Sequence, residues 1–463
     1  MSSTSSTLDM PSEPRQWSNK KRIILCADGT WEASDQGDKS HPSNVAKIAR
    51  AIATTGREKD PKTGNNIELK QVVFYQSGLG SGDLPLQRFV AGSFGWGLED
   101  DVCQIYEFIS NNYDSGDELF FFGFSRGAYT VRSVAGLVSD VGVLSADQMS
   151  SFPGLWEAYR KNTGGKAFTD TDWYKDPKNR GKLRKEDVTI KVVGVWDTVG
   201  ALGIPEWRLV QWAETVGFSV NKKYRFHNTR LSNNIEYAFQ ALALDERRFA
   251  FPPALWFKRD GGGPRKALSQ CWFPGVHGNI GGSCEEPIGA NTFAWMAIGD
   301  KLTFEKSVID KFVADYKELC GKTEVPWGCW SIDNRWEPLK LLGEKHRTPG
   351  EYKDRAVDEK NPSAPASDTQ ETFHSMVRWR KDQLDKWRPG SLADFIERPD
   401  SAHKWWWLKD NVKDIPEDST ISVTGDTMVV AYPQNGTVGY EDRGSLSREL
   451  CPEDIRAKLE HPT

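Results

Sequence analysis

The sequence predicts an α/β fold, with a mostly parallel sheet and helices on both of its faces. Short, wholly apolar runs, which are typical of strands buried on both faces, alternate with segments of helical periodicity. The 463 residues include 38% hydrophobic and 27% charged residues, a composition typical of soluble globular proteins. A chain of this length predicts one large domain and a smaller accessory region.

The first part of the chain alternates strands and helices. Residues 119–122 are all apolar and follow a turn signal at 114–117, so they predict a buried strand. Beyond residue 127, Val131, Val134 and Val138 recur at helical spacing. The predicted elements are, in order, a strand at 22–27, a helix at 44–54, a strand at 69–75, a helix at 98–112, the strand at 119–122 and the helix after it.

The middle of the chain predicts further elements of the same sheet. A polar stretch at 149–185 is expected to run over the surface. Residues 204–220 predict a helix that either packs on the core or forms a lid. The remaining predicted elements are strands at 188–195 and 267–273 and helices at 233–244 and 291–302.

The composition changes from about residue 330, where Pro, Lys, Asp and Ser become more frequent. Residues 361–367 predict a loop, and residues 421–432 predict a strand interrupted by a hairpin turn at Gly425-Asp426. We therefore predict three parts, which are a disordered tail at 1–19, a main α/β domain at 20–329 and an accessory region at 330–463 packed on the main domain.

Charge and cysteine usage exclude several classes of protein. A net charge of −5 gives no electrostatic footprint for nucleic acid. The seven cysteines form no C-x-x-C pair, so neither a disulfide framework nor a zinc site is indicated and a reducing compartment is expected. Residues 1–21 lack the apolar core of a signal peptide, and no run approaches a membrane span. We expect a cytoplasmic protein without a transmembrane segment.

A serine lies between the predicted strand at 119–122 and the helix that follows. Gly123, Ser125 and Gly127 form a G-x-S-x-G motif, and strand, motif and helix together are the context of a nucleophile elbow. The sharp turn of an elbow exposes the serine hydroxyl, and small flanking residues avoid crowding it. The alternative is a glycine-rich turn with a buried, inert serine.

A serine nucleophile needs a base, and the base needs a group that orients it. In elbow folds the chain order is serine, acid, histidine, each on a loop after a strand. Asp197 directly follows the strand at 188–195, and His277 follows the strand at 267–273 in a glycine-rich loop. We therefore predict that Ser125, Asp197 and His277 are the catalytic residues.

Other residues compete for two of these roles. Asp245 is the rival acid, and its structural alternative is an ion pair with Arg247 or Arg248. His227 and His374 are weaker candidates for the base, because neither follows a strand into a glycine-rich loop.

An oxyanion needs hydrogen-bond donors close to the serine. The backbone N–H of Arg126 is one candidate, because it directly follows the nucleophile. The second candidate is the loop that contains Asp28, Gly29 and Thr30, through the N–H of Thr30 or its neighbour. The alternative role for Asp28 is to cap local backbone N–H groups.

The Asp28-Gly29-Thr30 sequence also allows a different class of enzyme. Some phosphatases place an aspartyl nucleophile after their first strand, with a second aspartate two residues away. Here the residues two before and two after Asp28 are Cys26 and Thr30, so the pair of aspartates is incomplete.

Five short motifs occur along the main domain. They are D-G-T-W at 28–31, N-V at 44–45, G-F-S-R-G-A-Y at 123–129, G-V-W-D-T-V-G at 194–200 and W-F-P-G-V-H at 272–277. In order and spacing they resemble an α/β-hydrolase family that includes the bacterial type VI secretion phospholipase effectors and uncharacterised fungal proteins. The likeness covers about residues 21–302, and residues 372–378 and 387–390 are similar to the tail of the fungal members.

The resemblance implies an α/β-hydrolase fold, a triad of Ser125, Asp197 and His277, and ester hydrolysis, with phospholipase activity in some bacterial members. One position departs from the family, because relatives usually carry an aspartate two residues after the histidine, where this chain has Asn279. That difference bears on the local charge and leaves the triad in place. The chain also lacks a large membrane-docking module, so a phospholipid is the least supported part of the resemblance.

We therefore expect a serine hydrolase that cleaves carboxylic esters of lipids or small acyl groups, without a metal or an organic cofactor. The substrate is the expected partner, and transient contact with a membrane surface stays open, as does the oligomeric state. The alternative is a non-catalytic protein of the same fold that binds a ligand or another protein in its pocket.

Overall fold

The computed structural model describes residues 16–29, 41–60, 62–78, 98–162, 167–184, 188–199, 231–232, 234–249, 251–257, 267–284, 287–297, 302–332, 343–353, 368–401, 404–418, 429–432, 437–440 and 445–460. The strands are β1 Trp17–Ala27, β2 Thr55–Lys59, β3 Asn66–Gln76, β4 Glu118–Phe124, β5 Val143–Leu144, β6 Leu183–Arg184, β7 Thr189–Trp196, β8 Ile235–Ala243, β9 Ala267–Phe273, β10 Phe304–Glu305, β11 Glu371–His374, β12 Ile396–Pro399, β13 Trp405–Leu408, β14 Ile415–Asp418, β15 Val429–Tyr432 and β16 Thr437–Tyr440. The α-helices are α1 Asn44–Ala51, α3 Leu98–Asn112, α4 Ser125–Val141, α5 Phe152–Lys161, α6 Asp172–Lys175, α8 His277–Gly281, α9 Ile288–Met296, α10 Lys306–Thr323, α12 Ser375–Gln383, α13 Ser445–Leu450 and α14 Glu453–Glu460.

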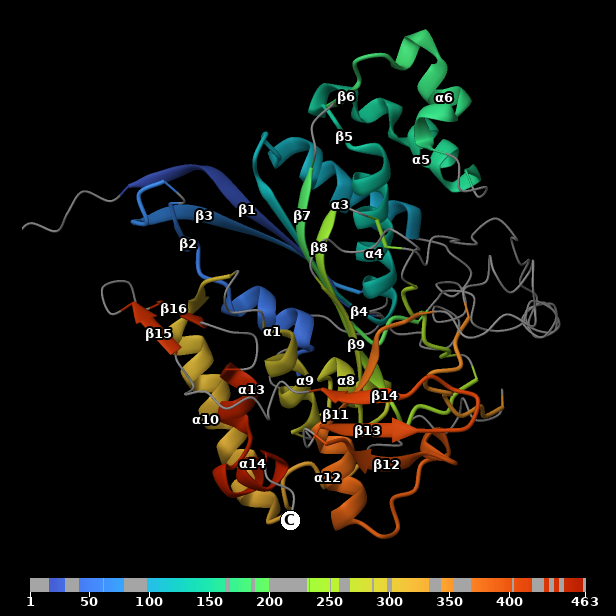
Figure 1. Ribbon diagram of the computed structural model, residues 1–463. Helices are drawn as coiled ribbons and strands as arrows, with labels where there is room; N and C mark the ends of the chain where they lie inside the picture. The colour runs from blue at the N-terminus through green and yellow to red at the C-terminus, as the bar shows by residue number, and fades with distance from the viewer. Residues whose placement is uncertain are drawn as a thin grey trace, which may run out of the picture.

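A large, mostly parallel sheet forms the centre of the fold (Figure 1). Within the described residues its strand order is β12-β13-β14-β11-β9-β8-β7-β4-β1-β3-β2. The pairs from β3 through β1, β4, β7, β8, β9 and β11 to β14 are parallel. The predicted α/β architecture with a mostly parallel sheet is therefore confirmed.

Helices cover both faces of the sheet, with α3 and α4 on one face and α1, α8 and α9 on the other (Figure 1). Alternate residues of β4 face the two layers. Leu119 and Phe121 pack with α3 and α4, whereas Phe120 and Phe122 pack with α1, α9 and α10. Every residue of β4 is buried, which explains why this strand is apolar throughout its centre rather than alternating.

Two glycines allow helix α4 to pack directly against the strands. A Cβ on Gly123 would lie 2.6 Å from the Cα of Ala128, in the first turn of the helix. A Cβ on Gly127 would collide with the carbonyl oxygens of Ala27 and Asp28, at the end of β1. Glycine is therefore required at both positions of the motif, because backbone atoms cannot move aside as a flexible side chain can.

Strands from the C-terminal part of the chain continue the main sheet. β11 pairs with β9 and β14, and β13 pairs with β12 and β14. Phe373 of β11 and Trp407 of β13 are buried in one apolar cluster with Leu242 of β8 and Trp272 of β9. The strands on both sides of residue 330 thus share one sheet, and the domain boundary at 329/330 stays a prediction.

The predicted helix at 233–244 is wrong, because Ile235–Ala243 form strand β8 between β7 and β9. This segment contains several alanines and a leucine, which favour helices. In the middle of a parallel sheet both faces of a strand are buried, so the period-2 signal disappears. Tertiary pairing with two neighbouring strands therefore overrides the local helical preference.

Most other predicted elements agree with the structure. The helix predicted at 291–302 begins earlier and ends at Met296, and the strand predicted at 421–432 is described only as Val429–Tyr432. The lid candidate at 204–220, the loop at 361–367, the hairpin turn at Gly425-Asp426 and residues 1–15 of the predicted tail lie outside the described residues. The prediction of disorder is wrong for residues 17–19, because β1 begins at Trp17 and pairs there with β3.

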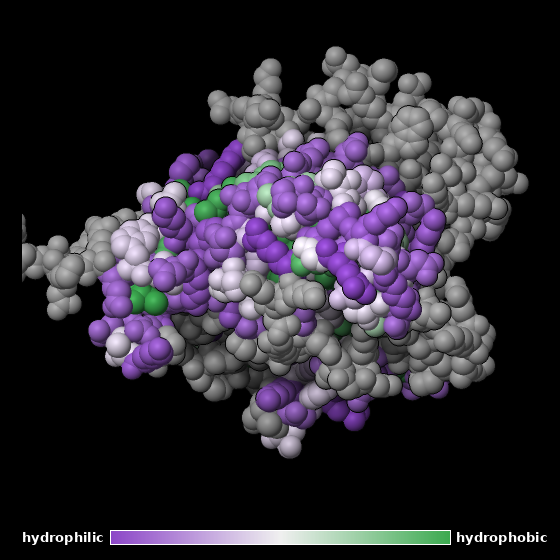
Figure 2. Space-filling view, turned by 90° about the horizontal axis from the view of Figure 1, so that it is seen from above, coloured by the Kyte–Doolittle hydropathy of each residue, from purple (hydrophilic) through white to green (hydrophobic). Residues whose placement is uncertain are grey.

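The polar stretch predicted at 149–185 contains α5, α6 and strand β6, which extend from the main body at the top of Figure 1. β6 pairs with β5, which precedes this stretch, in a small antiparallel ribbon. Phe152, Leu155 and Trp156 anchor the stretch to the core. Seen from above relative to Figure 1, the described surface is mostly hydrophilic, with small hydrophobic areas (Figure 2). Among the helices that the structure describes, none is long and apolar enough to span a membrane.

The close contact at Gly127 gives a test of the packing. Gly127→Ala should lower the free energy of unfolding by about 2 kcal/mol or more, because the added methyl group overlaps backbone atoms of β1. Chemical denaturation measures this change. Gly321→Ala is the control, because a Cβ there meets nothing within 4 Å. It should leave stability unchanged or raise it by up to about 1 kcal/mol. Equal effects of the two variants would contradict the packing described here.

Candidate active site

Ser125 lies at the sharp turn between β4 and α4. Its backbone φ is 56°, in the left-handed region that residues other than glycine rarely adopt. The residue is 6% exposed. A non-glycine residue held in this conformation carries strain, and such strain is concentrated at functional sites. Ser125 thus lies in a strained turn that joins a strand directly to a helix.

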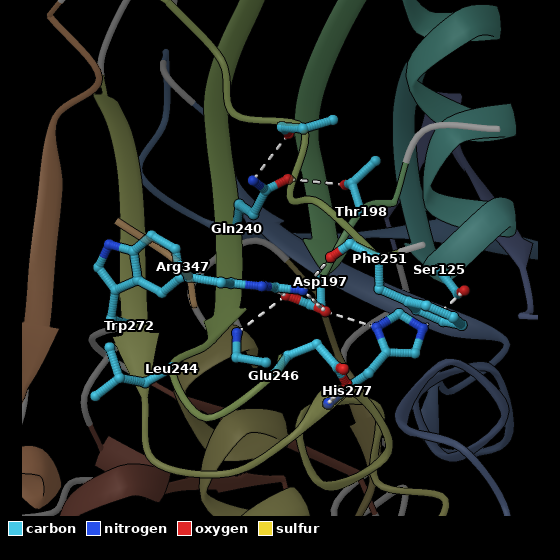
Figure 3. A network of polar contacts seen from close by, with 12 residues as sticks. Ser125, Asp197, Thr198, Gln240, Leu244, Glu246, Phe251, Trp272, His277 and Arg347 are labelled. Atoms are coloured by element: carbon cyan, nitrogen blue, oxygen red, sulfur yellow. Dashed lines mark hydrogen bonds and ion pairs between the residues drawn. The ribbon is translucent and has the colours of Figure 1, made fainter. Parts of the chain in front are cut away.

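His277 is the first residue of the short helix α8, directly after β9 and the loop of Gly275. Its Nε2 lies 2.8 Å from Oγ of Ser125, and its Nδ1 lies 2.6 Å from Oδ2 of Asp197 (Figure 3). An ionised carboxylate only accepts hydrogen bonds, so Nδ1 carries the proton and Nε2 is free to accept from the serine hydroxyl. The structure therefore brings together the three residues predicted from the chain order.

Asp197 follows β7 with a backbone φ of 39° and is 0% exposed. Its Oδ1 accepts a hydrogen bond of 3.0 Å from the backbone N–H of Ala243, at the end of β8. Arg347 donates to both carboxylate oxygens, through Nη1 to Oδ1 and through Nη2 to Oδ2 at 2.9 Å. The buried carboxylate thus has a partner for each of its oxygens.

The protonation states follow from burial and charge. Burial lowers the pKa of His277, and the neighbouring Asp197 opposes this effect. Burial acts to raise the pKa of Asp197, but Arg347 and His277 hold it below the ordinary value. Around neutral pH the site therefore contains a neutral imidazole beside an ionised carboxylate, as a general base requires.

Two aromatic rings enclose the imidazole of His277. The ring of Phe124 lies 4.7 Å from it between centroids, and the ring of Phe251 lies 5.0 Å away in an edge-to-face arrangement. These contacts restrict the rotation of the His277 ring.

The loop residues around Asp245 support the His277 backbone. Asp245 accepts a 2.7 Å hydrogen bond from the N–H of Gly275 and a 2.9 Å bond from Nε1 of Trp387. Its neighbour Glu246 accepts from the N–H of His277 at 3.1 Å and forms an ion pair with Arg248. The hydrogen bonds of Asp245 therefore position the histidine loop, and the predicted ion pair with an arginine belongs to Glu246 instead.

Gly29, in the described part of the loop after β1, lies beside Ser125. A Cβ on Gly29 would lie 3.1 Å from Cβ of Ser125. The N–H of Gly29 is engaged by Oδ1 of Asp28 at 2.8 Å, and Oδ2 of Asp28 accepts from Ser43 and Tyr75. Asp28 therefore caps and holds the loop. Thr30, the predicted second donor, lies outside the described residues.

Arg126 follows Ser125 in the first turn of α4, so its backbone N–H lies at the N-terminus of that helix. Its side chain is partly buried, and burial lowers its pKa to about 10 although Asp101 opposes this. The location agrees with the predicted role of its N–H, which stays a prediction.

The remaining candidates lie elsewhere. His374 caps helix α12 by accepting from the N–H of Met376 and packs on Phe273. His227 lies outside the described residues. Asn279 is the position that departs from the family pattern. Its Oδ1 accepts a 3.0 Å hydrogen bond from the N–H of Val276, so an uncharged side chain caps the start of α8.

Arg347 and Glu246 are the site residues that sequence reasoning did not find. Arg347 is 150 positions from its partner Asp197 and lies in no recognisable motif. Glu246 directly follows Asp245 in the sequence. The sequence shows the acidic pair but does not indicate which member contacts His277. Within the described part of the chain, no group of three or more His, Cys, Asp or Glu residues could hold a metal ion.

The carboxylate of Asp197 should control the protonation of His277. Asp197→Asn should lower the pKa of His277 further, by about one pH unit or more, because the lost charge is the group that raises it. NMR titration of the imidazole in the folded variant measures this. Asp114→Asn, at an exposed aspartate before the start of β4, should leave the titration unchanged. A His277 pKa that stays equal or rises in Asp197→Asn would contradict the arrangement.

The chain has recognisable relatives. Residues 21–298 match the family model described as T6SS, phospholipase effector Tle1-like, catalytic domain. An uncharacterized protein of Saccharomyces cerevisiae is 28% identical over 250 residues, which cover 50% of this chain and 32% of that protein. The chain thus matches about a third of the length of this relative.

Two solved structures are also similar. One is the crystal structure of an uncharacterized protein from Pseudomonas aeruginosa, at 17% identity and a TM-score of 0.31, covering 57% of this chain and 42% of that one. The other is the structure of the Tle1 effector bound to the VgrG spike from the type 6 secretion system, at 19% identity and a TM-score of 0.29, covering 61% and 55%. Both TM-scores are too low to establish a shared fold.

Proposed function

Because the chain belongs to the family of the T6SS phospholipase effector Tle1-like catalytic domain, we propose that it is a serine hydrolase of the α/β-hydrolase fold that cleaves carboxylic esters. The family expected from the motifs is confirmed by a match over 21–298. The observation that carries the proposal is the pair of contacts made by His277, 2.8 Å to the hydroxyl of Ser125 and 2.6 Å to the carboxylate of Asp197.

The proposed reaction begins with proton transfer. Oγ of Ser125 attacks the carbonyl carbon of the ester while its proton moves to Nε2 of His277. The electrons of the carbonyl double bond move onto oxygen and form an oxyanion. The ionised Asp197 stabilises the imidazolium that results and keeps Nδ1 protonated.

The oxyanion then collapses and the alcohol leaves with the proton from Nε2 of His277, which leaves the acyl group on Ser125. A water molecule attacks the acyl group and gives its proton to Nε2. The bond between the acyl carbon and Oγ then breaks, and Oγ takes the proton back from Nε2, which releases the carboxylic acid and restores the serine. The N–H of Arg126 and the loop that begins at Asp28 are the proposed oxyanion donors, since Arg126 directly follows the serine and Gly29 lies beside it.

The proposed substrates are esters of lipids or small acyl groups. A lipid ester is supported because the family is that of a phospholipase effector, and a short acyl ester needs only the three residues and the oxyanion donors. Asp28 is proposed as a structural residue rather than a phosphatase nucleophile, because its two oxygens accept hydrogen bonds from Gly29, Ser43 and Tyr75.

Removal of the nucleophile tests this function. Ser125→Ala should reduce kcat on a short p-nitrophenyl ester by about 10⁴-fold or more, because the covalent step loses its attacking oxygen. A steady-state assay, run beside a panel of phospholipids, measures the loss and the preferred substrate class. Unchanged turnover by the folded variant would remove Ser125 from the proposed role.

A second serine in the same helix provides the matched control. Ser133 is buried two turns along α4, and its hydroxyl donates to the carbonyl oxygen of Tyr129 at 2.8 Å. Ser133→Ala should keep kcat close to that of the wild type. Equal losses in both variants would indicate damage to α4 rather than loss of a nucleophile.

A further inference from the structure

We infer that Arg347 is a positioning residue of the active site, supplied by a segment that lies outside the family match at 21–298. This inference rests on the proposed function, because it assigns a role to Arg347 in preparing Asp197 and His277 for the reaction. It extends the site to residues 343–353, here named the Arg347 segment.

The guanidinium of Arg347 is built into the site rather than attached to the surface. Its side chain is 2% exposed, and it meets Asp197 from the side away from His277 (Figure 3). It donates to both carboxylate oxygens, and Nη2 also donates to the carbonyl oxygen of Phe251 at 2.9 Å. Phe251 is the residue whose ring packs on His277. The side chain of Arg347 therefore holds both the carboxylate of Asp197 and the backbone of Phe251, whose ring packs on His277.

A two-pronged donor fixes more than the distance to a carboxylate. Two parallel N–H bonds define the plane of the Asp197 carboxylate, so Oδ2 is aimed at Nδ1 of His277. A lysine would supply a point charge without that planar fork. The positive charge also balances an anion that would otherwise be costly to bury.

The Arg347 segment is held in place at several points. The backbone N–H of Lys345 donates to the carbonyl oxygen of Arg247 at 2.8 Å, and the N–H of Phe249 donates to the carbonyl oxygen of Gly343 at 3.1 Å. Further along, the N–H of Gly350 donates to the buried carboxylate of Glu371 at 3.0 Å.

Tyr352 adds an aromatic contact, stacking on Trp272 of β9 with 6.2 Å between ring centroids. The segment is thus tied to the loop after β8 and to the strands β9 and β11. These contacts keep the guanidinium of Arg347 from withdrawing from the site.

The charge of Arg347 also bears on the titration of His277. The charged groups around the imidazole are Asp197 at the end of β7, Glu246 and Arg248 in the loop after β8, and Arg347 behind Asp197. Arg347 offsets the attraction of Asp197 for a protonated imidazole. Removal of this cation should therefore raise the pKa of His277 and leave less of the neutral base at slightly acidic pH.

Two substitutions separate the charge of Arg347 from its geometry. Arg347→Gln removes the charge but keeps an amide donor, and it should move the acid-side inflection of kcat/KM upward by about one pH unit. Arg347→Lys keeps the charge but loses the fork, so the inflection should stay near that of the wild type. In both variants kcat should fall by about 10- to 100-fold with KM little changed, because Asp197 and His277 are less well oriented.

An ion pair between helix α12 and strand β14 provides a matched control. Arg378 makes a buried, two-pronged ion pair with Glu417, at 2.8 and 3.0 Å, on β14. Arg378→Gln removes a comparable pair and should leave both kcat and the inflection at their wild-type values. It therefore separates a general loss of stability from a specific effect on the site.

The test also separates this inference from the proposed function. NMR titration of His277 in wild type and Arg347→Gln needs no turnover. A raised His277 pKa without ester hydrolysis in the wild type would support the positioning role and reject the proposed function. Ester hydrolysis that needs Ser125, with an unchanged inflection in folded Arg347→Gln, would overturn the inference alone. If Arg347→Gln does not fold, Arg347→Lys decides, because wild-type kcat in that variant would also overturn it.

Discussion

A buried negative charge is the constraint on which this structure depends. The carboxylate of Asp197 is 0% exposed, and an unpaired ion at that depth would cost several kcal/mol, on the order of the stability of a whole domain. The fold compensates with donors from three directions, which are the N–H of Ala243, the imidazole of His277 and the fork of Arg347. The charge stays ionised because each oxygen is satisfied, and the orientation of His277 follows from that.

The parallel sheet explains why these groups meet. The residues that follow β4, β7, β8 and β9 lie at the same edge of the sheet, because parallel strands end together. Ser125 and Asp197 both adopt positive φ values at that edge. The chain therefore turns sharply after each strand and directs both side chains toward His277. The glycines around Ser125 let α4 start close to β1. Local strain at the turns is thus supported by the packing of the sheet.

Much of this could be predicted from the sequence, because its signals are local. A buried apolar strand, a G-x-S-x-G and a helix identify Ser125, and chain order identifies Asp197 and His277. The sequence predicts a helix where the structure has strand β8, because burial on both faces removes the alternation that marks a strand. Arg347 had no local signal at all. Its position depends on how residues 343–353 cross the edge of the sheet, which only tertiary contacts determine.

Covalent labelling distinguishes an activated Ser125 hydroxyl from a buried structural one. The folded protein would be treated with a fluorophosphonate probe, and mass spectrometry of its peptides would locate the adduct. We expect a single adduct on Ser125, formed faster as pH rises through the pKa of His277. Folded protein that remains unlabelled, or that carries the adduct on another residue, would contradict this expectation and favour a ligand-binding protein with the same fold.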